Sequence, residues 1–167
     1  SLMTPVATAL KEQLEILSQH GYKVISVREL KKLYPFEDFH DVSKNFEIAR
    51  DLDQQGFILG YKTNEFKPDK ELTIGEMIMM TLTKQDYKED LAKICNSKKD
   101  KSMYLKHPYY IGCKHYNRLD LMDRLDTVAT KEDIRRFFNE QLGIDPVISK
   151  NTLKRFEYLE ALSQLKK

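Results

Sequence analysis

The 167-residue chain contains no tryptophan and only two cysteines, six glycines and five prolines. Two cysteines are too few for a disulfide framework, so we expect Cys95 and Cys113 to be free, partly buried thiols. No apolar run approaches the ~20 residues of a membrane-spanning helix, and the first ten residues lack the pattern of a signal peptide. The 28 basic and 26 acidic residues nearly cancel, which argues against a dedicated nucleic-acid-binding protein.

The sequence also lacks the common catalytic motifs. It has no glycine-rich phosphate loop, no HExxH zinc motif and no Ser-His-Asp pattern. Cys113 and His115, with His107 nearby, lack the fourth ligand of a zinc site. The candidate helix–loop–helix segments lack the complete set of oxygen ligands and the central glycine of a calcium-binding loop. We therefore expect a non-enzymatic protein that needs no metal and no cofactor.

Helical periodicity is what the chain does have. Apolar residues make up 41% of it, enough for the core of a single domain over residues 1–167. Apolar side chains recur at spacings of three and four, and several of the segments between the predicted helices hold Gly or Pro. This pattern predicts an all-α fold with helices near residues 5–20, 27–34, 43–55, 74–82, 86–95, 108–117, 131–142 and 152–165, the last capped by Asn151.

The inward-facing positions of these helices, together with a short apolar run after Gly56, give an expected core. Apolar residues that repeat on one helix face are those most often buried. The expected core residues are Leu14, Leu17, Leu30, Ala49, Leu52, Ile58, Met77, Ile111, Ile134 and Phe137.

Three of the predicted helices begin with a capping box. The boxes start at Ser26, Thr73 and Thr130, and each has an acidic residue three positions later. The hydroxyl of such a cap accepts a hydrogen bond from the backbone, and the acid binds the backbone of the cap in return. The boxes lie roughly 50 residues apart, a spacing typical of repeated supersecondary units.

Residues 36–82 contain the most specific pattern, a helix, a tight loop and a capped second helix. In this order of residues the segment resembles the S-layer homology (SLH) repeat. The residues that carry the resemblance are Phe39, Asp41, Val42, Ala49, Leu52, Gly56, Ile58, Gly60, Tyr61, Phe66, Pro68, Leu72, Thr73 and Glu76.

The resemblance implies a helical prism in which three helix–loop–helix repeats pack around a pseudo-threefold axis. In this interpretation the three boxes superpose. The segments would be repeat one over about 4–35, repeat two over 36–82 with a connector over 83–103, repeat three over about 104–143, and a C-terminal helix over 151–165.

SLH domains are non-catalytic modules that anchor proteins at the bacterial envelope by binding an anionic cell-wall glycan. The resemblance therefore implies that function and a groove beside the boxes. In the family an arginine follows the capping threonine and holds the glycan, whereas this chain has Val27, Ile74 and Lys131 at those positions. The expected ligand-binding residues are Arg28, Tyr61, Asn64, Thr73, Thr130 and Lys131.

Within this set Lys131 and Arg28 would hold a carboxylate or phosphate, and Tyr61 would stack on a sugar.

Two alternatives remain open, because fold alone does not carry function. One is a helical protein-interaction module that has lost glycan binding, with a protein as partner. The other is a regulatory domain of a larger enzyme. The expected location is the cell envelope or the exterior if an export signal lies outside this sequence, and the cytoplasm otherwise.

Overall fold

The computed structural model describes residues 4–40, 43–96 and 107–165. The chain divides into two compact units, Ser1–Leu33 and Tyr34–Lys167, and each is described here by itself. Asp41 and Val42 of the SLH-like pattern lie outside the described residues. Part of the predicted connector, and the first residues of the predicted third repeat, do so as well.

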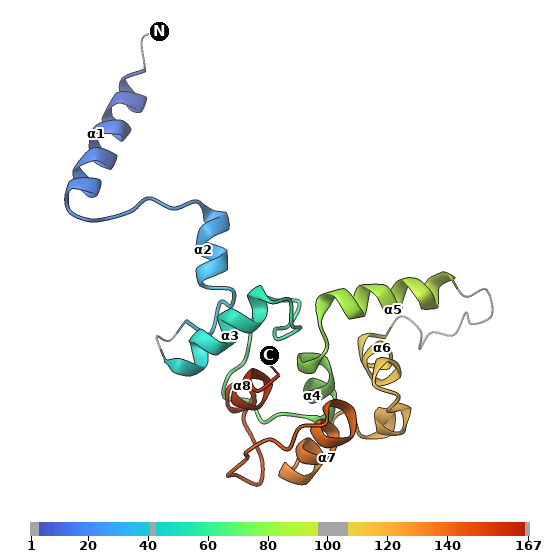
Figure 1. The fold of residues 1–167 in the computed structure, drawn as a ribbon. Coiled ribbons are helices and arrows are strands. Elements are labelled where there is room, and N and C mark those ends of the chain that lie inside the picture. The colour runs from blue at the N-terminus through green and yellow to red at the C-terminus, as the bar shows by residue number, and fades with distance from the viewer. Residues whose placement is uncertain (1–3, 41–42, 97–106, 166–167) are drawn as a thin grey trace. The chain divides into compact units, whose positions relative to one another are not determined.

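The first unit contains two helices, α1 (Pro5–Gln19) and α2 (Val27–Leu33) (Figure 1). Thr4 caps α1 by accepting a hydrogen bond from the Ala7 N–H at 3.3 Å. The predicted box at Ser26 forms: the Ser26 N–H donates to the Glu29 carboxylate at 2.8 Å, and the Glu29 N–H donates to Ser26 Oγ at 3.1 Å.

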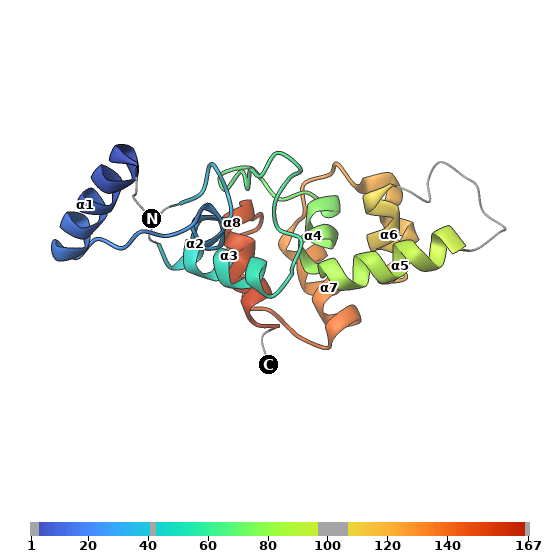
Figure 2. The same ribbon diagram turned by 90° about the horizontal axis from the view of Figure 1, so that it is seen from above.

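The second unit is helical as well, and its described residues contain only isolated β-bridges. The all-α prediction is therefore confirmed. Figure 1 and Figure 2 show α3 beside α8 and α4 beside α6, and these helix pairs are in contact. The helices are α3 (Lys44–Gln54), α4 (Ile74–Thr81), α5 (Lys84–Asn96), α6 (Pro108–His115), the 3₁₀ helix η2 (Leu119–Arg124), α7 (Lys131–Leu142) and α8 (Arg155–Ser163).

The prediction for the last helix was wrong at its start. It begins at Arg155 rather than at 152, and Lys154 rather than Asn151 is its N-cap. Residues 152 and 154 are extended instead, because each pairs with another segment of the unit.

The core lies in the second unit. The six predicted core residues of that unit's helices are all buried: Ala49, Leu52, Met77, Ile111, Ile134 and Phe137.

The core prediction was wrong for the first unit. Leu14, Leu17 and Leu30 are 36%, 43% and 46% exposed, and neither α1 nor α2 buries any residue. Periodicity identified a helix face correctly but could not tell whether that face has a partner. Ile58 was also misplaced: it is half-buried, while Leu59 is buried. Successive side chains of an extended segment point to opposite sides, so an error of one residue exchanges them.

Three extended segments pair with one another just before α4, α7 and α8. In each pairing, the N-cap residue of one helix forms a β-bridge with the residue two positions before the N-cap of the next helix. The order of the helices is α4, α7, α8 and then α4 again. The sequence pattern did not indicate this closed three-way ring. The bridges join Thr73 to Val128, Thr130 to Thr152, and Lys154 to Glu71.

Backbone hydrogen bonds repeat the same register around the ring. The donor is always the first residue of a helix, and the acceptor is the carbonyl three positions before the next cap. Each bond satisfies an N–H that the helix itself leaves unpaired. The bonds run from Ile74 to Thr127 at 2.9 Å, from Lys131 to Asn151 at 2.6 Å, and from Arg155 to Lys70 at 2.8 Å.

The first prediction concerns the cap of α7. Thr130 Oγ1 accepts from the Asp133 N–H at 3.2 Å and donates to its carboxylate at 2.8 Å. Thr130→Ala removes both bonds and should lower the free energy of unfolding by about 1 kcal/mol, measured by urea denaturation. Thr130→Ser keeps the hydroxyl and is the control. Equal losses in the two variants would contradict this role of the hydroxyl.

Candidate functional site

A cluster of charged and aromatic side chains surrounds Glu76, the third residue of α4. Its carboxylate is only 5% exposed. Oxygen Oε1 accepts hydrogen bonds from the Tyr61 hydroxyl and the Lys70 ammonium, and it lies 3.4 Å from Arg155 Nη1. Oxygen Oε2 accepts from the Thr73 N–H at 3.1 Å, which completes the predicted capping box. One carboxylate thus joins a helix cap, a loop tyrosine and two cations.

Arg155, the first residue of α8, is 2% exposed. Its Nε donates to the Phe66 carbonyl at 2.7 Å and its Nη2 to the Leu59 carbonyl at 2.6 Å. The guanidinium also lies 4.6 Å from the centre of the Tyr61 ring. Arginine suits this position, because its planar fork can satisfy several acceptors in one place. Arg155 therefore fixes the loop over residues 57–66 to the start of α8.

The ionisation of this cluster follows from its contacts. Burial alone would raise the pKa of Glu76, but the hydrogen bonds from Lys70 and Tyr61 and the charge of Arg155 outweigh it, so the pKa is lowered. Burial and the bond to Glu76 raise the pKa of the Tyr61 hydroxyl. Burial, and then the Glu76 charge, raise the pKa of Tyr109. At neutral pH the cluster holds an ionised carboxylate and neutral tyrosines.

A pocket opens over this cluster, which we call the tyrosine pocket. The Tyr109 ring lies against Gly75, where a Cβ would come within 2.9 Å of ring atom Cε1. Glycine at this position therefore lets the ring approach the start of α4. The residues lining the pocket are Ile58, Leu59, Gly60, Tyr61, Lys62, Glu76, Met79, Met80, Tyr87, Pro108, Tyr109 and Arg155.

The structure brings two of the predicted ligand-binding residues together. Tyr61 lines the tyrosine pocket, and Thr73 caps the helix that carries Glu76. Asn64 is exposed and has a left-handed φ of 61°. Its carbonyl accepts from the Glu37 N–H at 3.0 Å, so Asn64 shapes the loop. The Tyr61 ring also has Lys67 Nζ 4.5 Å from its centre, so part of its surface is already covered.

The remaining predicted residues lie elsewhere. Thr130 and Lys131 begin α7 at a different corner of the ring, and neither lines the tyrosine pocket. Arg28 is exposed on α2 in the first unit.

Glu76, Tyr109 and Arg155 were not among the ligand-binding residues predicted from the sequence. One available signal was the similarity of residues 153–157, Leu-Lys-Arg-Phe-Glu, to residues 72–76, Leu-Thr-Ile-Gly-Glu. In that alignment Arg155 stands at the position where an SLH repeat has its box arginine. Lysine at the cap obscured the match, because its side chain cannot accept the capping hydrogen bond.

Both cysteines are free, as predicted. Cys113 is fully buried, and burial raises the pKa of its thiol to about 11. Cys95 is exposed rather than partly buried. His115 Nδ1 lies 2.7 Å from an Asp90 carboxylate oxygen and links α6 to α5.

Comparisons with protein families, with curated proteins and with solved structures gave no match to this chain. Within the described ranges, no helix combines the length and apolar character needed to cross a bilayer.

A second prediction tests Arg155. Arg155→Met keeps most of the apolar stem but removes the cation beside Glu76 and the donor of two buried carbonyls. Removing one partner of a buried ion pair costs about 3–5 kcal/mol, so the melting temperature should fall sharply. Arg135→Met is the matched control, because Arg135 pairs with Asp145 at an exposed site. A similar, small change in both variants would contradict a structural role for Arg155.

A third prediction concerns pH. The pKa of Glu76 is lower in the folded than in the unfolded chain, so its ionisation stabilises the fold above the unfolded value of about 4.3. That stability is lost as the pH falls through the folded pKa. Glu76→Gln should therefore be less stable than wild type at pH 7, and the difference in unfolding free energy should narrow as the pH falls below about 5. Urea denaturation across this range is the measurement; a gap independent of pH would refute the assignment.

Proposed function

We propose that residues 34–167 form a non-catalytic, SLH-like module that binds an anionic cell-wall glycan. The ring of extended segments supports this architecture, because α4, α7 and α8 enter it in the same register. In this proposal these three helices are the capped helices of diverged repeats around a pseudo-threefold axis. The third member is the helix at Lys154, and the box at Ser26 belongs to the other unit.

The observation that carries the proposal is the tyrosine pocket above the Glu76–Arg155 cluster. Tyr87 and Tyr109 offer aromatic surface to the apolar face of a sugar ring, as aromatic side chains do in mixed polar sites. Lys62 lines the same pocket and is exposed, so its ammonium can reach a carboxylate or phosphate. Arg155 acts through the loop it holds, since its own donors are engaged within the protein.

Lys131 is the second candidate cation for the glycan. Its ammonium has no ion pair within 4 Å among the residues described, so it is available to a ligand at a different corner of the ring. Variants of Lys62 and Lys131 therefore distinguish the tyrosine pocket from a site at α7.

The fourth prediction separates these sites. A hydrogen bond to a charged group contributes about 1.5–3 kcal/mol, so Lys62→Ala should weaken retention on purified anionic cell-wall polymer roughly tenfold. Tyr109→Ala should weaken it as well, by removing the stacking surface. Added salt should weaken binding of the wild type, because the exposed charges are screened over ~8–10 Å.

Lys131→Ala and Lys114→Ala, an exposed position on α6, are the comparisons. Loss of retention in Lys131→Ala alone would move the site to α7. No retention of the wild-type protein, or retention unaffected by salt and by every variant, would overturn glycan binding. Melting temperatures of all variants exclude loss of fold as the cause.

A helical protein-interaction module is the second candidate. The observation that favours it is the exposure of apolar side chains along α1, among them Val6 at 79% and Leu10 at 55%. A single amphipathic helix of this length is marginal in water without a partner surface. Under the glycan proposal the module would act at the cell envelope, and under this alternative its partner would be a protein.

A further inference from the structure

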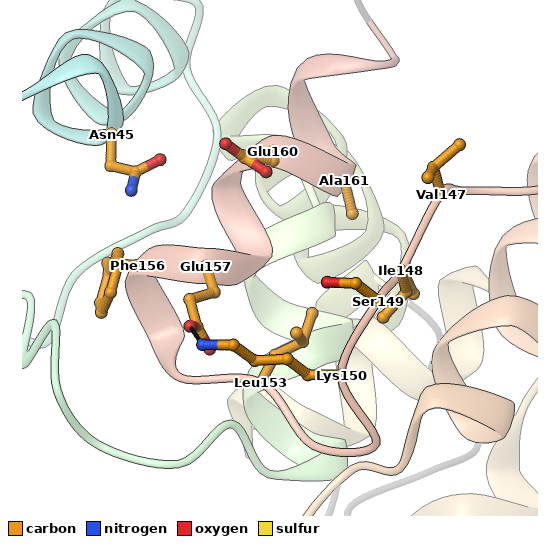
Figure 3. Close-up of a pocket in the computed structure, with 10 residues that line it drawn as sticks. All are labelled: Asn45, Val147, Ile148, Ser149, Lys150, Leu153, Phe156, Glu157, Glu160 and Ala161. Atoms are coloured by element: carbon orange, nitrogen blue, oxygen red, sulfur yellow. Dashed lines mark hydrogen bonds and ion pairs between the residues drawn. The ribbon is translucent and has the colours of Figure 1, made fainter.

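A second pocket lies beside α8 and repeats the placement of the tyrosine pocket. We call it the α8 pocket. Figure 3 shows its polar side chains, which come from α3, from the segment before α8 and from α8 itself. The residues used below are Asn45, Ser149, Lys150, Glu157, Glu160 and Ala161.

The two pockets use equivalent positions. The α8 residues of this pocket occupy the same sequence positions after the Lys154 cap as three tyrosine-pocket residues do after the Thr73 cap. They are Glu157, Glu160 and Ala161. Asn45 is the second residue of α3, which packs on α8, just as Tyr109 is the second residue of α6, which packs on α4. The three equivalent residues of α4 are Glu76, Met79 and Met80.

The chemistry of the two pockets differs. Glu160 stands where the tyrosine pocket has Met79, and Asn45 stands where it has Tyr109. These exchanges replace apolar and aromatic surface with hydrogen-bond acceptors. In Figure 3 the Asn45 side-chain oxygen is directed toward the side of the pocket where Glu160 lies. The α8 pocket thus has hydrogen-bond acceptors at the positions where the tyrosine pocket has apolar or aromatic surface.

Among the residues that the structure describes, one of these acceptors is buried without a donor, and another is an exposed carboxylate with no cation beside it. Asn45 Oδ1 is buried and has no hydrogen-bond partner within the described part of the chain. The Glu160 carboxylate has no cation within 4 Å among those same residues. Glu157, in contrast, is engaged: it accepts from the Lys150 ammonium and from the Lys154 N–H at 2.9 Å. A buried acceptor without a donor is costly, so the pocket favours a group that donates.

Charge decides which kind of donor fits. Glu157 and Glu160 outweigh the single cation Lys150, so the pocket carries a net negative charge. Buried apolar side chains lie behind the acceptors, with Ile148 and Leu153 each 7% exposed. An ammonium group offers three donors and a positive charge, and a short aliphatic stem covers apolar surface.

We propose that the α8 pocket binds a primary ammonium group carried on a short apolar stem. The ammonium donates to Asn45 Oδ1 and to the Glu160 carboxylate, and the stem lies against Ile148 and Leu153. This site does not depend on glycan binding in the tyrosine pocket.

The experiment is an NMR titration of the wild-type chain with n-butylammonium chloride at pH 7, read from backbone amides and from the Asn45 side-chain amide. We expect saturable shifts at Asn45, Ser149 and Ala161. The neutral analogue 1-butanol should bind at least fivefold more weakly. Glu160→Gln should weaken butylammonium binding about tenfold, the effect of losing one charged hydrogen bond. Lys150→Met should tighten it severalfold, because a competing cation is removed.

Glu160 and Lys150 are both largely exposed, so these variants should keep the fold, and melting temperatures check this. Glu89→Gln, an exposed glutamate on α5, is the matched control and should leave binding unchanged. Equal affinity for butanol, equal loss in Glu160→Gln and Glu89→Gln, or shifts confined to the tyrosine pocket would each overturn the proposal. Absence of saturable shifts in the wild type would overturn it as well.

Discussion

The second unit depends on the ring in which three extended segments share their backbone hydrogen bonds. The first N–H groups of a helix have no partner inside the helix and must find acceptors elsewhere. Here the first residue of each capped helix donates to the segment before the next one, and the set closes after three steps. The starts of α4, α7 and α8 are therefore fixed relative to one another, although segments far apart in sequence supply them.

The ring determines what Arg155 can do. Since its backbone N–H is bound to Lys70 O at 2.8 Å, its side chain leaves the ring toward the loop over residues 57–66 and toward Glu76. A buried ion pair contributes little net stability, because desolvation offsets the attraction. The stronger effect of Arg155 is to fix positions. It holds two loop carbonyls, a tyrosine and a carboxylate in one arrangement. The side chains around Glu76 in the tyrosine pocket are thereby held in place by contacts within the protein.

Local signals predicted the helices and the caps well, because both arise from neighbouring residues. The boxes at Thr73 and Thr130 have the expected hydrogen bonds. Long-range features were harder to predict. The third member of the ring was missed, since Lys154 cannot cap with its side chain and only its pairing with Glu71 reveals its place. The burial of Leu14 and Leu17 was wrongly expected for a related reason: an apolar face shows that a helix can pack, without showing what it packs against.

The same geometry explains how one scaffold holds two chemically distinct pockets. The backbone ring fixes the starts of α4 and α8, and α6 packs on α4 as α3 packs on α8. The two pockets are therefore lined by side chains at the same sequence positions after their helix caps. None of the ring's backbone bonds requires a particular side chain at the third or fourth position after the box acid. The third position holds the half-buried Met79 in one pocket and the exposed Glu160 in the other, whereas Met80 and Ala161 at the fourth position are buried in the core. Because the ring is held by backbone hydrogen bonds, the side chain at the third position can differ between the two pockets without breaking the ring.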